Sequence, residues 1–243
     1  MKVLSIIILS TIILISCGSQ QEVNNVEVIN KSEKVLKKNV SSQSIDTAFN
    51  FDNSTIGEAP KSWSMSFTGK AGEKPDWRIM DDNGFRVLSQ QSYENPNNHF
   101  NNIVYDGLIT KNVELQVSLK GVKGQMDQGG GFIWRFIDAD NYYVVRANPL
   151  EDNVVMYKVE NGKRTDLPVL GKGRTYGVDV KPLGSDWNRL KLIAIDDLFT
   201  VYLNDEQIFQ VKDDTFTNAG KVGLWTKADA ISYFYKFIVK AAN

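Results

Sequence analysis

Two residue types limit the catalytic chemistry that the sequence can support. The 243 residues contain one histidine, His99, and one cysteine, Cys17. One Cys excludes an intrachain disulfide and a zinc site built on Cys pairs, and one His leaves little room for a His metal cluster or a Ser-His-Asp triad. His99 lies in an Asn-rich stretch, residues 95–102, which predicts a solvated loop residue rather than a metal ligand.

The acidic residues do not form the pair that a strand-borne glycosidase needs. A retaining enzyme holds two carboxyl groups about 5–5.5 Å apart, which acids two or four residues apart on one strand would provide. Glu114 is followed by Gln116 where a second acid would stand, and Asp138 and Asp140 flank an expected turn. We therefore expect no glycosidase catalysis from a strand. The sequence names no catalytic residue and leaves open whether the chain is an enzyme.

Aromatic and arginine side chains suit the binding of a sugar. Aromatic rings stack on the C–H face of a pyranose, and planar polar groups bind its hydroxyls. The candidate ligand-binding residues are Trp77, Trp134, Arg135, Tyr142, Tyr143, Arg146, Tyr157 and Trp225. We expect Arg135 and Arg146 to share one concave sheet face. Either Tyr142 or Tyr143 would lie beside them, because neighbours on a strand point to opposite faces. The alternative is that both arginines pair with nearby aspartates on a solvated sheet.

Oxygen ligands for a metal are present without a known metal-binding spacing. They are Asp138, Asp140, Asn141, Asp196, Asp197, Asp213 and Asp214. Calcium needs only oxygen donors, and none of these residues follows the EF-hand pattern. We expect no cofactor, with a structural calcium ion as the alternative that stays open.

Short strands must position these side chains. From Phe49 onward apolar residues recur at every second position, as in residues 112–119 and 187–195. Asn161-Gly162 is a strong hairpin signal, and no apolar stripe of helical period runs over a dozen residues. Ten or more strands of this kind predict an all-β, antiparallel two-sheet β-sandwich, or jelly roll, with five to seven strands in each sheet.

The N-terminal residues read as an export signal. Lys2 precedes an apolar run over residues 3–15, which is shorter than the roughly 20 residues that span a bilayer. Leu14-Ile15-Ser16-Cys17 is similar to a bacterial lipobox, in which the Cys becomes the lipidated first residue. The alternatives are an ordinary signal peptide with an incidental Cys and an uncleaved anchor.

The domain organisation and location follow from this signal. We expect a lipoprotein signal peptide over residues 1–16, and a polar, disordered tether over residues 17–48 that begins with lipidated Cys17. The sandwich domain would occupy residues 49–243. The protein would then be exported and lipid-anchored in a bacterial cell envelope, with a membrane as its partner and the leaflet not predicted.

Composition narrows the function classes. The chain has 28 Lys and Arg against 29 Asp and Glu, and 42% of its residues are hydrophobic. These values argue against wholesale disorder and a multi-span membrane protein. The near-zero net charge argues against a nucleic-acid partner.

Several segments are similar in order and type to a known group of domains. They are Trp77-Arg78-Ile79-Met80, residues 129–135, residues 140–146, Trp187-Asn188-Arg189-Leu190 and residues 220–229. Together they resemble the concanavalin A-like (laminin-G-like) jelly-roll domains of secreted bacterial proteins, on the branch related to 3-keto-disaccharide hydrolase-like domains. The resemblance covers residues 49–240 and implies the fold, but no single activity.

Three functions remain in view. The first is a surface or periplasmic lipoprotein whose lectin-like sandwich binds a glycan or another envelope component. The second is a glycan-processing hydrolase of the 3-keto-disaccharide hydrolase-like type, which the resemblance alone implies. The third is a structural or adhesive envelope protein without a small-molecule site. The sequence predicts neither the identity of a ligand nor the oligomeric state.

Overall fold

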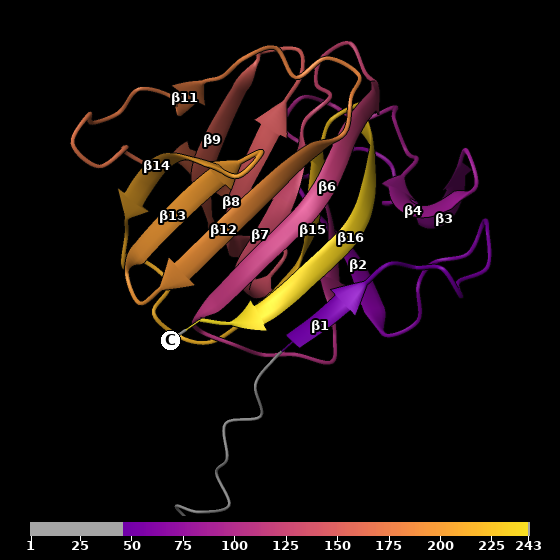
Figure 1. Cartoon of the computed structure of the whole chain (residues 1–243), viewed down its shortest axis with the longest axis horizontal. Coiled ribbons are helices and arrows are strands. Elements are labelled where there is room, and N and C mark those ends of the chain that lie inside the picture. The colour runs from indigo at the N-terminus through magenta and orange to yellow at the C-terminus, as the bar shows by residue number, and fades with distance from the viewer. Residues whose placement is uncertain (1–45, 243) are drawn as a thin grey trace, which may run out of the picture. The chain divides into compact units, whose positions relative to one another are not determined.

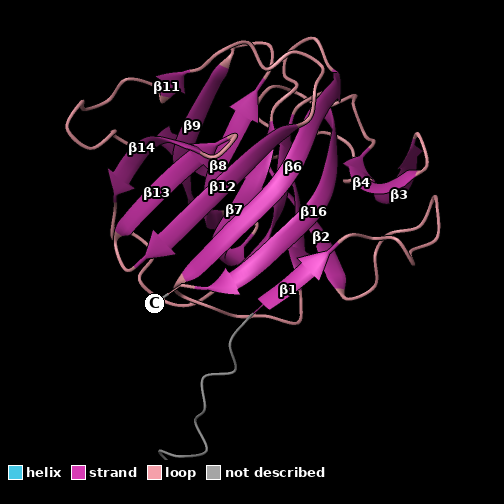
Figure 2. Cartoon of the chain, in the orientation of Figure 1, coloured by secondary structure: helices cyan, strands magenta, loops and turns pink. Residues whose placement is uncertain are grey.

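The computed structural model describes residues 46–242, and the regular elements of this part of the chain are all strands. Sixteen antiparallel strands form two eight-stranded sheets that pack face to face (Figures 1 and 2). The predicted all-β sandwich is confirmed, although both sheets are larger than expected. Within the described residues no helix is long and apolar enough to cross a membrane.

The first sheet, sheet A, has its longest strands at its centre. In spatial order it contains β14 (Glu206–Lys212), β13 (Leu198–Leu203), β12 (Asn188–Ile195), β6 (Val113–Lys123), β16 (Ile231–Ala241), β4 (Phe85–Gln90) and β3 (Trp77–Asp82). One half of β16 pairs with β4, and the other half pairs with β1 (Asp46–Phe49). Strand β1 thus begins three residues before the expected domain start at Phe49.

The second sheet, sheet B, has a similar size. In spatial order it contains β10 (Lys163–Asp166), β9 (Asn153–Glu160), β8 (Asn141–Asn148), β7 (Gly130–Asp138), β15 (Lys221–Lys227), β5 (Phe100–Tyr105) and β2 (Trp63–Thr68), with β11 (Val178–Asp179) beside β9. Strand β15 enters from the far end of the sequence and lies between β7 and β5.

Apolar residues at every second position of the strands form the core between the sheets. In β6 the residues Val113, Leu115, Val117 and Leu119 are all buried, and the residues between them are half-exposed. They belong to the same apolar cluster as Phe132 of sheet B. The tight turns agree with their sequences, since Asn161 and Gly162 have φ of 50° and 73°, as a type I′ hairpin requires.

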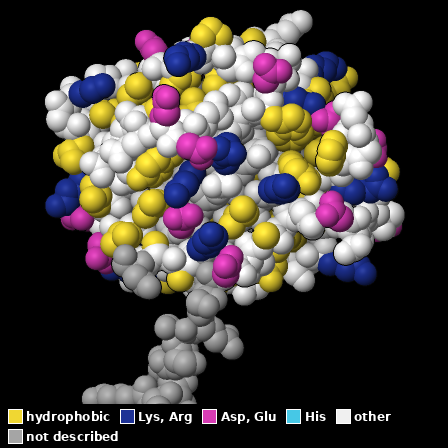
Figure 3. Space-filling model, in the orientation of Figure 1, with side chains coloured by type: hydrophobic (Ala, Val, Ile, Leu, Met, Phe, Trp, Pro, Cys, Tyr) yellow, Lys and Arg dark blue, Asp and Glu magenta, His cyan; other side chains and the backbone are white. Residues whose placement is uncertain are grey.

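The outer faces of the two sheets differ in character. Sheet A presents interspersed charges to solvent (Figure 3), including the ion pairs Lys120–Asp82 and Lys191–Glu114. The outer face of sheet B carries a second apolar cluster. Its ten buried residues are Phe100, Val104, Ile133, Phe136, Tyr142, Val144, Val155, Tyr157, Val159 and Trp225. Burial on both faces gives β8 and β9 continuous apolar runs instead of alternation, and it marks this outer face as unusual.

Candidate functional site

The structure places six of the eight sequence candidates on the two faces of sheet B. Trp134 and Tyr143 point into the core between the sheets, where Trp77 of sheet A also lies. Tyr142, Tyr157 and Trp225 lie on the outer face. Arg146 joins them there because it is paired across β8 and β9 with Val155. Arg135 lies on neither face.

Arg135 is bound to the backbone at the end of the sandwich. The pairing of β7 with β8 is irregular after Trp134, and Arg135 itself has φ of 47°. Its guanidinium donates hydrogen bonds to the carbonyls of Lys111 at 3.1 Å, Phe216 at 2.7 Å and Asp196. Burial lowers its pKa. The expectation that Arg135 and Arg146 share one face is therefore wrong, because the irregular strand turns the first arginine away.

The outer face of sheet B carries one row of side chains across four strands. Arg146 of β8 is paired with Gly131 of β7, Gly131 with Trp225 of β15, and Trp225 with Asn102 of β5. A Cβ atom at Gly131 would lie 1.9 Å from the carbonyl oxygen of Val145, so the position requires glycine. The row therefore has no side chain between the guanidinium and the indole.

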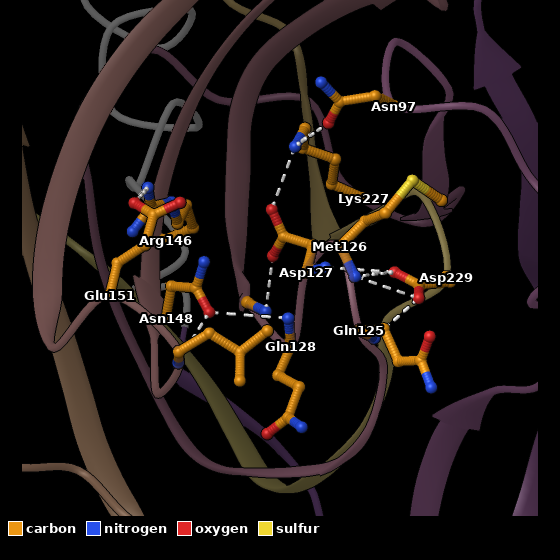
Figure 4. Close-up of polar contacts among 12 residues, drawn as sticks. Asn97, Gln125, Met126, Asp127, Gln128, Arg146, Asn148, Glu151, Lys227 and Asp229 are labelled. Carbon is orange, nitrogen blue, oxygen red and sulfur yellow. Dashed lines mark hydrogen bonds and ion pairs between the residues drawn. The ribbon is translucent and has the colours of Figure 1, made fainter.

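Arg146 is buried and bonds to several residues around the row, and Figure 4 shows its pair with Glu151. Its Nη2 atom lies 2.7 Å from Glu151 and 3.2 Å from the hydroxyl of Tyr157, and its Nη1 atom bonds to Asn153. Burial lowers its pKa, but Tyr157 and Glu151 oppose this and leave the pKa raised. Its Nε–H is buried without a hydrogen-bond partner among the described residues.

The opposite side of the row carries an unpaired acceptor. Asn102 is fully buried, and its Oδ1 atom has no hydrogen-bond donor within the described part of the chain. Its amide nitrogen lies 3.5 Å from the hydroxyl of Thr68. An unsatisfied buried polar group costs about 1–3 kcal/mol. The unpartnered Nε–H of Arg146 and Oδ1 of Asn102 both lie beneath the accessible surface, as do unpartnered indole nitrogens of Trp77 and Trp134 in the described core.

A buried ion pair borders the row. Lys227 lies two residues beyond Trp225 on β15, and its Nζ atom is 3.1 Å from Asp127 and 2.5 Å from Asn97 (Figure 4). The second oxygen of Asp127 accepts the N–H of Gly129 at 2.6 Å. Both charges are thus compensated, as a buried pair requires.

Asp229 fixes the loop that carries Asp127. Its carboxylate accepts the backbone N–H groups of Gln125 at 2.6 Å, Met126 at 3.1 Å and Asp127 at 3.0 Å (Figure 4). Burial raises the pKa of Asp229, but the three donors outweigh it and leave the pKa lowered. The same loop lines a cavity of about 670 Å³ beside Tyr93.

We expect Asp229→Asn to destabilise the domain at neutral pH by about 1 kcal/mol, the size of a lost capping interaction. The folded pKa lies below the ordinary 3.8, so the stabilisation is complete above that value and is lost as the pH falls through the folded pKa. Denaturant unfolding of both proteins at pH 7 and pH 3 measures this. The gap should shrink at pH 3, whereas Glu206→Gln, an exposed control, should show no gap. A gap that widens in acid would contradict this role.

Sheet B curls until residues four strands apart touch across its outer face. The hydroxyl of Thr68 in β2 lies 2.8 Å from that of Tyr142 in β8, although β5, β15 and β7 separate these strands. Trp225 donates its indole N–H to the same Tyr142 hydroxyl at 3.3 Å. Burial raises the pKa of Tyr142 to about 12 against these hydrogen bonds. The phenol therefore stays protonated and closes the curl.

Two residues at the rim complete the aromatic surface. Tyr176, which is 46% exposed, has its ring centroid 6.0 Å from that of Tyr157 and 6.0 Å from the guanidinium carbon of Arg146. The Arg164 guanidinium carbon is 4.4 Å from the ring centroid of Tyr157 and 4.9 Å from that of Phe100. Rings, guanidinium groups and amides thus lie on one curved face. These are the side-chain types that bind sugars in proteins.

Sequence reasoning missed several residues of this face, namely Asn102, Asp127, Arg164, Tyr176 and Lys227. The sequence pattern could have placed two of them on this face. Lys227 is two residues from Trp225 on one strand, so both side chains point the same way. The Asn161-Gly162 hairpin pairs Arg164 with Val159, so Arg164 lies on the same face as that valine. Asn102 was hidden because the Asn-rich stretch was interpreted as a loop, whereas β5 already begins at Phe100.

His99 is a structural residue. It is fully buried, with Nδ1 2.8 Å from the carbonyl oxygen of Ala71 and Nε2 3.0 Å from the Asn101 side-chain oxygen. Its ring stacks on Phe67 at 4.6 Å. The expectation of a solvated histidine is wrong because the Asn-rich stretch folds into the end of sheet B.

The acidic residues considered for calcium have other contacts. Asp138 accepts the N–H of Asp140 and the amide of Asn141 in the β7–β8 turn, and Asp213 accepts the hydroxyl of Tyr143 at 2.6 Å. Among residues 46–242, no group of three His, Cys, Asp or Glu side chains is arranged to hold a metal ion. The predicted signal peptide, Cys17 and the tether up to residue 45 lie outside the described residues.

Comparison with known proteins places the fold in a class. No protein-family model matches the sequence, and no curated protein matches it. Among solved structures, the carbohydrate-binding module CBM66 from Bacillus subtilis is 19% identical, with 74% of this chain and 96% of that chain covered and a TM-score of 0.55. The cellulose-induced protein Cip1 is 10% identical, with 79% and 96% covered and a TM-score of 0.56.

A third structure extends the likeness to a recognition domain. The carbohydrate recognition domain of Emp47p is 13% identical, with 84% of this chain and 96% of that chain covered and a TM-score of 0.50. At these identities the likeness concerns the fold. The domain is therefore an antiparallel two-sheet β-sandwich of the kind these structures share, and its function must be argued from its own residues.

Proposed function

We propose that this domain binds a glycan on the outer face of sheet B. The observation that carries the proposal is the exposed ring of Tyr176, which lies beside Tyr157 and the guanidinium of Arg146 at the rim of this face. A sugar ring can stack on such an exposed aromatic face, and the guanidinium groups nearby can bind its polar substituents. The names of the compared structures, a carbohydrate-binding module and a carbohydrate recognition domain, support this proposal.

The carboxylates near the row favour binding over hydrolysis. A glycosidase needs one carboxyl group with a raised pKa as its acid. Burial raises the pKa of Glu151, but the charge and hydrogen bond of Arg146 outweigh it and leave the pKa lowered, so this group is ionised. Asp127 is bound to Lys227 and to the N–H of Gly129. Glu151 and Asp127 are thus each paired with a cation, and Glu151 lacks the raised pKa that a catalytic acid needs to stay protonated.

We expect Tyr176→Ala to weaken glycan binding about 3–10-fold, since one exposed stacking ring contributes about 1 kcal/mol. Binding is measured by affinity electrophoresis of the full chain against galactan, xylan, glucomannan, dextran, polygalacturonate and alginate. Tyr176 is exposed, so the midpoint of thermal unfolding should not change. Phe85→Ala is the matched control, because Phe85 is 56% exposed in sheet A.

Two outcomes would contradict the proposed function. One is that no polysaccharide of the panel retards the protein. The other is that Phe85→Ala weakens binding as much as Tyr176→Ala, which would place the contact away from the outer face of sheet B.

We propose further that the chain is a bacterial lipoprotein anchored through Cys17. The support is the sequence order of Lys2, the apolar run and the lipobox-like residues before the sole cysteine. Labelling of expressing bacteria with radioactive palmitate tests it. We expect label on the unaltered protein and none on Cys17→Ser, and equal labelling of both proteins would contradict the anchor.

A further inference from the structure

We propose that the glycan is acidic, with Arg164 binding a sugar carboxylate on the outer face of sheet B. This inference rests on the proposed glycan-binding function and names the chemical class of the ligand. The outer face of sheet B carries or borders three cations, Arg146, Arg164 and Lys227. Arg146 is paired with Glu151 and Lys227 with Asp127. Arg164 has no ion pair or side-chain hydrogen bond within residues 46–242, and its neighbour Asp166 is bound to Arg174.

The position of Arg164 keeps its charge available. In the β9–β10 hairpin it is paired with Val159, whose side chain lies on the outer face. Its guanidinium carbon lies 4.4 Å from the ring centroid of Tyr157, 4.9 Å from that of Phe100 and 6.0 Å from that of Trp225. Aromatic faces hold a guanidinium by cation–π attraction while its N–H groups stay in the plane of the group. Those N–H groups can bind a carboxylate with two parallel hydrogen bonds.

The exposed ring of Tyr176 fixes where the sugar ring would lie. Tyr176 is 46% exposed, and its ring centroid lies 6.0 Å from that of Tyr157, the ring over which the Arg164 guanidinium lies. A sugar ring that stacks on Tyr176 would therefore bring its own carboxylate, or that of the next sugar, close to Arg164. A uronic acid combines these groups in one residue.

The test compares polymers that differ only in charge. Polygalacturonate and alginate are measured against their carboxyl-reduced forms by isothermal titration with the full chain, and dextran sulfate serves as a sulfate-bearing polyanion. We expect at least one polyuronate to bind about tenfold or more tighter than its reduced form, the usual size of one charge-assisted contact. Arg164→Gln should abolish that preference, and Arg164→Lys should retain only part of it because Lys lacks the planar fork.

The control is Lys163→Gln, an exposed cation one position away whose side chain points to the other face. It should leave the preference intact, and equal thermal midpoints would show that all variants fold. Three results would overturn the inference. They are equal binding of the reduced polymers, an equal loss in Lys163→Gln, and dextran sulfate binding as tightly as the polyuronates. If neutral polymers bind in a Tyr176-dependent way and as tightly as the polyuronates, the inference fails and the glycan-binding function stands. If no polymer binds, both fail.

Discussion

Arg135→Ala lowers the free energy of unfolding by about 3–5 kcal/mol, the cost of removing one member of a buried charged network. The guanidinium donates to the carbonyls of Lys111, Asp196 and Phe216, which lie in loops of both sheets. The variant leaves those acceptors without their donor and opens a hole beside Phe199. In a domain of this size such a loss lowers the thermal midpoint by roughly 6–20 °C. Calorimetry and guanidinium unfolding measure it.

A surface arginine provides the control for this prediction. Arg189 forms an exposed ion pair with Asp205, so Arg189→Ala should cost less than about 1 kcal/mol. At a temperature where Arg135→Ala is still folded, we expect it to bind glycan as tightly as the unaltered protein. Lost glycan binding with an unchanged thermal midpoint would contradict the structural role and restore the arginine to a binding patch.

Arg146→Lys weakens glycan binding by about 10–100-fold, because a hydrogen bond to a charged group contributes roughly 1.5–3 kcal/mol. Lys keeps the positive charge opposite Glu151 but has no Nε–H and no planar fork. The bonds of Arg146 to Asn153 and to the hydroxyl of Tyr157, the ring beside the exposed Tyr176, are therefore lost. Isothermal titration with the tightest-binding polysaccharide of the panel measures the loss.

The comparison with stability separates binding from folding in this variant. Because Lys can still pair with Glu151, we expect its thermal midpoint to fall far less than that of Arg135→Ala. Arg189→Lys is the matched control in sheet A and should bind normally. An affinity of Arg146→Lys within twofold of the unaltered protein would show that this guanidinium does not position the binding surface.

Regular strands could be predicted from the sequence because their face alternation is local. Val113 and Leu115 in β6 lie in the core as expected, and the Asn161-Gly162 turn joins β9 to β10. Arg135 could not be placed in the same way. The alternation rule assumes an unbroken ladder, and β7 is irregular after Trp134, with Arg135 at positive φ.

The candidate site was only half predictable, because it depends on contacts between distant parts of the chain. Arg146 and Trp225 were candidates from their residue types alone. Their position in one row follows from the insertion of β15 between β7 and β5, which no local pattern specifies. Asn102 joins the row for the same reason. The curl of sheet B, closed by Thr68 and Tyr142, is likewise a property of the whole sheet.

The most direct test of the account is to map where the glycan binds. Backbone amide shifts of the isotopically labelled full chain are followed by nuclear magnetic resonance during titration with the tightest-binding polysaccharide. We expect the largest changes in β8, β9 and β15, around Arg146, Tyr157 and Trp225. Changes centred instead on Trp187 and Tyr235, which pack together on the other sheet's outer face, would contradict the central claim.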